Sequence, residues 1–149
     1  MITDKLTSFG FPVALNTGAA GSYLLGDVIP LDVARDLGNS TQLYLVISCA
    51  VTAASAGAAT ATFKLVTDAQ AAINPTTATV HAQSPAVPVA SMVAGKSLFV
   101  IALPLEGNAY ETFMGIVQVT GTAAFTAGSV HAFLTPTPPA WKAYAEGAN

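Results

Sequence analysis

The sequence predicts an all-β, single-domain jelly-roll or β-sandwich with short helical turns and extended termini. Apolar residues recur with period two or in short solid runs and rarely at helical spacing, which is the pattern of strands. Gly, Pro and Asn separate these runs about every 8 to 12 residues, as in sandwiches and jelly rolls. The length of 149 residues is that of one domain with a sizeable core.

We expect one domain over residues 1–149, with an N-terminal segment over 1–20 and a Pro-rich C-terminal arm over 135–149. The longest apolar run, 98–105, contains a proline and is far shorter than the ~18 residues that span a bilayer. A transmembrane helix and a membrane partner are therefore not expected.

The predicted strands follow from alternation along the chain. A weak one covers 22–29, and 43–51 alternates so as to give one heavily apolar face. In 61–65, Ala, Phe and Leu alternate with Thr and Lys, which predicts a half-exposed strand. The remaining strands are expected at 77–83, 97–103, 112–120 and 129–134.

Glycine and proline positions predict the connections. Gly121 and Gly128 bracket an expected hairpin tip, with 112–120 pairing against 129–134. Two short helical turns are expected at 32–37 and at 68–73. Gly38 is placed to end the first in a left-handed conformation, and Asn74 with Pro75 stops the second.

The charge content predicts an interaction surface. Only 9% of the residues are charged, against roughly 25% in an ordinary soluble domain. The surface must therefore consist largely of Thr, Ser, Ala and Gly, which cost little to dehydrate when a partner binds. The net charge is −3 and the five basic residues are scattered, so direct nucleic-acid binding is not expected.

The sequence offers little support for catalysis or for a cofactor. It contains no nucleophile elbow, phosphate loop, dinucleotide fingerprint or zinc spacing, so we predict no enzyme and no cofactor. His81 and His131 lie in strand candidates that lack further ligands, so we expect packed or surface histidines there rather than metal ligands. Cys49 is expected in the core, where it acts as a small hydrophobe.

The motifs also carry a resemblance when taken in order. The segment 31–38 is followed by the strand 43–51, and the segment 63–68 is followed by the turn residues 74–77. Further along the chain, 103–104 and Gly107 precede Tyr110, and the turn at 121–122 is followed by Gly128 and then by 132–134. This succession resembles the capsid cement, or head decoration, proteins of tailed bacteriophages, of the jelly-roll type, over about residues 2–144.

The resemblance implies a structural virion protein on the outer surface of the phage capsid, made in the host cytoplasm. It would bridge subunits of the major capsid protein and stabilise the shell against internal DNA pressure. It also implies self-association, with a homodimer favoured and a trimer possible. The alternative is a carbohydrate-binding or cell-surface-binding jelly-roll module of a phage fibre, and an enzyme is the least supported class.

Candidate contact residues come from the termini and from the segment 27–35. Aromatic and arginine side chains are the usual anchors of interfaces, and the acidic residues lie beside the one arginine. The candidates are Phe9, Phe11, Asp27, Asp32, Arg35, Trp141 and Tyr144. A cation site at the acidic residues is disfavoured, because their spacing fits no calcium loop.

The C-terminal arm can be tested by truncation. Deleting the residues after Leu134 is expected to weaken assembly, because Pro-rich sequence loses little entropy on docking and Trp141 and Tyr144 can act as anchors. The other interpretation is a frayed terminus. Oligomer size and partner binding measured by sedimentation distinguish the two, and unchanged values would defeat the arm.

Overall fold

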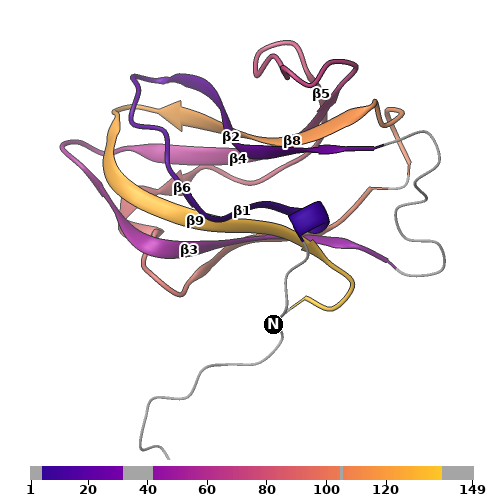
Figure 1. Cartoon of the computed structure of the whole chain (residues 1–149). Coiled ribbons are helices and arrows are strands. Elements are labelled where there is room, and N and C mark those ends of the chain that lie inside the picture. The colour runs from indigo at the N-terminus through magenta and orange to yellow at the C-terminus, as the bar shows by residue number, and fades with distance from the viewer. Residues whose placement is uncertain (1–4, 32–41, 105, 139–149) are drawn as a thin grey trace, which may run out of the picture.

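The computed structural model describes residues 5–31, 42–104 and 106–138, and it forms two antiparallel sheets packed as layers (Figure 1). The strands are β1 Ser8–Ala14, β2 Gly21–Pro30, β3 Tyr44–Ser55, β4 Thr60–Asp68, β5 Thr79–Gln83, β6 Val87–Pro88, β7 Ser97–Ala102, β8 Phe113–Gly121 and β9 Phe125–Thr135. Two short 3-10 helices, η1 Lys5–Thr7 and η2 Val89–Ser91, complete the secondary structure of the described residues. The predicted all-β sandwich class is confirmed.

The order of strands decides which surfaces the protein presents. One sheet has four strands in the order β1-β9-β3-β7. The other has the order β2-β8-β4-β5, with β6 pairing against the beginning of β4. Among the described residues, no helix has the length and apolarity needed to span a membrane.

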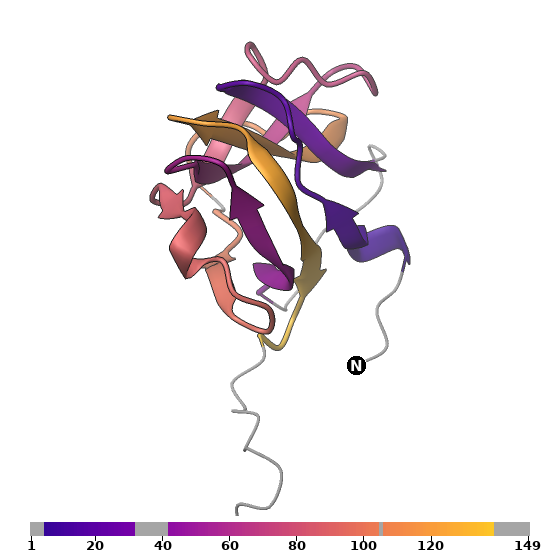
Figure 2. The same ribbon diagram turned by 90° about the vertical axis from the view of Figure 1, so that its left-hand side faces the viewer.

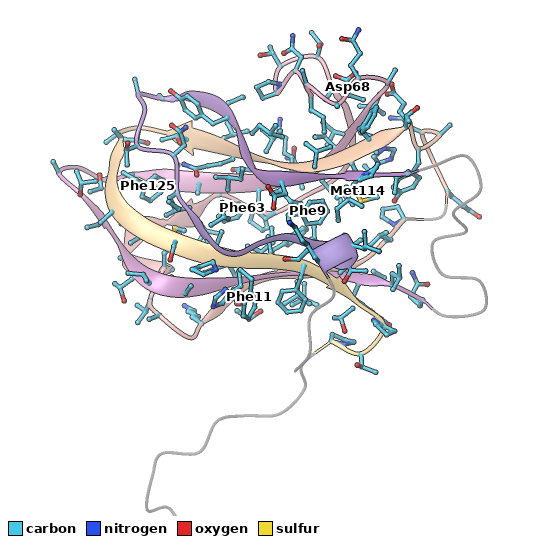
Figure 3. The ribbon with its side chains drawn as sticks, viewed as in Figure 1. Phe9, Phe11, Phe63, Asp68, Met114 and Phe125 are labelled. Atoms are coloured by element: carbon cyan, nitrogen blue, oxygen red, sulfur yellow. The ribbon has the colours of Figure 1, made fainter. Side chains whose placement is uncertain are left out.

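The core lies between the two sheets and comes from the alternation within each strand. In β4, Phe63 and Leu65 are fully buried, whereas Lys64 between them is partly exposed. Figure 3 shows Phe63, Phe9, Met114 and Phe125 between the layers. Full burial of one such side chain contributes about 1.5–3 kcal/mol, so these residues hold the layers together.

The predicted hairpin between 112–120 and 129–134 is wrong. β8 pairs with β2 and β4, whereas β9 pairs with β1 and β3 in the opposite sheet. The short link 122–124 therefore crosses between the layers. Gly128 lies inside β9 with φ +129°, where a Cβ would come within 2.9 Å of the Ala53 Cα atom. This glycine permits a close backbone approach and does not form a turn.

The predicted helical turn at 68–73 is also wrong, and residues 69–72 form bends. The Asp68 carboxylate accepts hydrogen bonds from the backbone N–H groups of Gln70 at 3.1 Å and Asn74 at 3.2 Å. Such local bonds offer the backbone an alternative to helical pairing. The other predicted turn, at 32–37, lies outside the described residues.

The N-terminal segment differs from the expected extended terminus because residues 8–14 form β1, an edge strand of the sandwich. β1 pairs with β9 and also packs against β2 of the other sheet. Gly26 in β2 allows this approach, because a Cβ there would collide with the carbonyl oxygen of Phe9. The two sheets are thereby closed against each other along this side.

Two glycines with similar backbone angles test the close approach of β1 and β2. Gly26 has φ +68° and Gly95 has φ +82°, but a Cβ at Gly95 would meet no atom within 4 Å. Gly95→Ala is expected to cost about 1 kcal/mol for the left-handed backbone alone. Gly26→Ala should cost about 1–3 kcal/mol more for the collision. Urea unfolding measures both, and equal losses would contradict this account.

Candidate interaction face

The four-stranded sheet carries no charged residue in any of its strands. β1, β9, β3 and β7 contain no Lys, Arg, Asp or Glu, whereas the other sheet contains Asp27, Lys64 and Asp68. We call the solvent side of the four-stranded sheet the uncharged face. Its principal residues are Phe11, Val46, Val51, Val100, His131 and Phe133.

Strand alternation places these side chains on the outside. In β9, Val130, Ala132 and Leu134 belong to the core cluster, so the residues between them point away from it. The register continues this row across the sheet, because Phe133 lies opposite Val46 and Val46 lies opposite Val100. An apolar row therefore crosses from β9 through β3 to the edge strand β7.

Phe11 covers part of this row. Its ring stacks on His131 with the centroids 3.8 Å apart and meets Phe133 edge-on at 6.0 Å. Figure 3 shows Phe11 on the outer side of the sheet, away from the other layer. Each aromatic pair contributes about 0.5–1.5 kcal/mol beyond its buried area. Because the Phe11 ring lies against it, Phe133 is only 4% exposed, although it faces outward.

Large apolar side chains remain accessible on this face. Phe11 is 54% exposed, Val51 is 55% exposed and Val100 is 44% exposed. The large exposed hydrophobic residue on the strands of the other sheet is Val80, at 39%. A partner covering the uncharged face would bury apolar surface, gaining about 25 cal/mol per Å², without stripping water from a charge.

Two polar atoms on the outer side of β9 lack partners. Ser129 Oγ and His131 Nδ1 are buried and make no hydrogen bond in the described structure. Burial lowers the pKa of His131, so its imidazole is neutral near pH 7 and adds no charge to the face.

A second polar cluster lies at the other sheet. The Thr67 hydroxyl lies 2.7 Å from His81 Nε2 and accepts the Glu111 N–H at 3.2 Å. Glu111 Oε1 in turn accepts the Thr79 hydroxyl at 2.5 Å, and Tyr110 stacks on His81 with the centroids 4.0 Å apart. Because Thr67 is fully buried, its hydroxyl cannot reach a substrate, and the cluster instead ties the segment before β8 to β4 and β5.

The structure separates the residues that metal binding or thiol chemistry would use. His81 lies in β5 and His131 in β9, in different sheets. Within the described ranges, no three His, Cys, Asp or Glu residues are grouped so as to hold a metal ion. Cys49 is buried as predicted, its Sγ donates to the Val51 carbonyl at 3.2 Å, and burial raises the pKa of its thiol.

The predicted contact residues are divided by the structure. The prediction of Phe9 as a contact is wrong, because its ring is fully buried between the sheets and unavailable to a partner. Phe11 is exposed on the uncharged face. Asp27 is exposed in β2 and lines a shallow groove of about 330 Å³ together with Lys5. The remaining candidates, Asp32, Arg35, Trp141 and Tyr144, lie outside the described residues.

Sequence reasoning missed the other residues of the uncharged face. Val51, Val100 and Phe133 sit in strands read only for their core positions. A count of charges strand by strand does not single out this face, because 43–51, 97–103 and 129–134 contain none but neither do 77–83 and 112–120, which belong to the other sheet. That count does not reveal that these strands share one sheet.

Comparison with known protein families identifies the family to which the chain belongs. Residues 16–134 match the family model Bbp16. The chain belongs to the Bbp16 family. The Bbp16 family is phage-associated, and the chain is a phage-associated structural protein. This is the general class of protein that the sequence resemblance predicted. None of the curated proteins compared with the chain matches it.

The histidines of this Bbp16 protein make its stability depend on pH. Burial lowers the pKa of both His81 and His131, while Glu111 partly opposes the shift at His81. A base whose pKa is lower in the folded than in the unfolded chain contributes stability above the unfolded pKa, about 6.5, and this is lost as pH falls through the folded pKa.

We therefore expect the urea midpoint to be steady above about pH 7 and to fall as the pH drops below about 6.5. His131→Phe, which keeps a ring under Phe11 but cannot titrate, should reduce this dependence. A variant with the same pH profile as the unmodified protein would contradict the role of His131.

Proposed function

We propose that this protein is a capsid cement protein that binds the outside of the phage head and bridges major capsid subunits. The observation that carries the proposal is the uncharged face, the outer side of a sheet whose four strands carry no charge, where Phe11, Val51 and Val100 are exposed. Membership in a phage-associated family and the β-sandwich fold support it.

The chemistry of the face suits attachment to a protein lattice. Contacts made through apolar and small neutral side chains avoid the desolvation cost of charges. Phe11 stands above its surroundings on a packed base of His131 and Phe133, which is the arrangement of an interface anchor. The core of an interface is depleted in charged residues in the same way.

Stabilisation of the shell would follow from selective binding. A protein that binds only the expanded lattice stabilises that state by linkage, as any selective ligand does. Each contact can be weak, because many copies bound over a symmetric shell act together. Self-association, with a homodimer favoured and a trimer possible, would let one unit bridge neighbouring capsid subunits.

Two exposed valines on opposite sheets provide a matched test. Val51→Lys places a charge on the uncharged face, and Val80→Lys makes the same change on β5 of the other sheet. We expect Val51→Lys to weaken retention on expanded heads at least about tenfold, because the ammonium must be desolvated. Val80→Lys should bind nearly as the unmodified protein does.

Cosedimentation with heads lacking the protein measures retention, and the heat resistance of the same heads measures stabilisation. Equal retention of both variants would remove the uncharged face from the contact. Heads equally resistant with and without the protein would overturn the cement function itself.

A further inference from the structure

β7 differs from the other edge strands of the described sandwich. Natural sheets protect their edges with short strands, charges, prolines, bulges or a covering element. β1 contains Pro12 and packs against β2, which itself carries Asp27 and the irregular position Gly26. β5 is short and partly polar, and β6 has two residues, one of them Pro88.

β7 has few of these protections. Its six residues, Ser-Leu-Phe-Val-Ile-Ala, include no charge, proline or glycine, and it is the last strand of its sheet. Its one irregularity lies at the beginning, between Ser97 and Phe99, and the pairing with β3 is regular from Phe99 to Ala102. A six-residue apolar edge of this kind is a template for another strand.

The hydrogen-bonding pattern shows which backbone groups face outward. The Leu103 N–H donates to the Leu43 carbonyl at 2.8 Å, which makes this the bonded pair of the antiparallel ladder. Bonded and non-bonded pairs alternate, so Val100 and Ala102 direct their N–H and C=O groups away from β3. In Figure 2 the salmon-coloured segment that includes η2 and β7 runs along one side of the molecule.

We propose that β7 pairs with β7 of a second copy in antiparallel orientation, with Val100 opposite its own counterpart at a two-fold axis. This register uses the outward backbone groups of both strands and joins the two four-stranded sheets into one continuous sheet. The two uncharged faces then become a single surface of double length.

Charge favours a second copy as the occupant. The strand itself is neutral, and the charged residue nearest to it in the sequence is Lys96, which immediately precedes it. In the antiparallel register, the two Lys96 side chains lie at opposite ends of the paired strands, whereas a parallel arrangement would place these like charges together. Identical neutral strands therefore fit each other without a charge conflict.

This inference deepens the self-association within the proposed function and rests on it. One pair of edge strands buries less than the roughly 1,600 Å² of a standard interface, so pairing should be weak in dilute solution. Copies held side by side on a shell would pair more fully, because their effective concentration is high.

Cysteine cross-linking of the full-length protein, without capsids, tests the register. Bonded antiparallel pairs have Cα atoms about 5.5 Å apart, within the range that a disulfide spans. The native Cys49 is buried and contributes little background. Val100→Cys is expected to form a covalent dimer about tenfold faster than Val51→Cys, a more exposed valine on the central strand β3.

Equal rates at the two positions, or faster cross-linking at position 51, would overturn the proposal, the latter indicating that two faces stack instead. Since these measurements need no heads, their failure leaves the cement function to be judged by head retention.

A proline at the same position provides a second readout. Val100→Pro removes an N–H that points away from β3, a place where edge strands tolerate proline. We expect the dimer population in sedimentation equilibrium to fall about tenfold while thermal unfolding changes little. Undiminished dimerisation of the folded variant would overturn the proposal.

Discussion

The pairing of β9 with β1 on one side and β3 on the other is the constraint on which the rest of the structure depends. Its register with β3 runs from Tyr44 opposite Thr135 to Ser55 opposite Phe125, the length of the sheet. Because both edges of β9 are occupied, β8 must enter the other sheet, and the link between them crosses the sandwich. The inner side chains of β9 fill the core, and its outer ones form the base of the uncharged face.

That base explains how a surface residue can be both exposed and fixed. Phe11 lies on His131 and against Phe133, so its orientation is set by two ring contacts while half of it remains accessible. Buried polar atoms without partners are rare, and here two of them, Ser129 Oγ and His131 Nδ1, belong to outward-facing residues of β9. At His131, the stacking of the Phe11 ring opposes the free energy lost at the unpartnered nitrogen.

The two sheets present chemically different surfaces. The sheet containing β4 carries Lys64, Asp68 and Asp27, and its polar cluster around Thr67 and His81 fixes a loop. The opposite sheet has neither charges nor such a cluster in its strands. The four strands that carry no charge thus form one face of the protein. This sheet is where attachment to a lattice and pairing of copies are proposed.

The sequence alone determined the fold class and the positions of most strands, because period-two alternation is a local property. The prediction at 61–65 lies within β4, and 97–103 nearly coincides with β7. Alternation could not find β1, whose Pro12 reads as a breaker, or show that Phe9 is core and Phe11 surface. Those outcomes, the partners of β9 and the gathering of neutral strands into one sheet were decided only by the tertiary structure, because they depend on contacts between residues far apart in the chain.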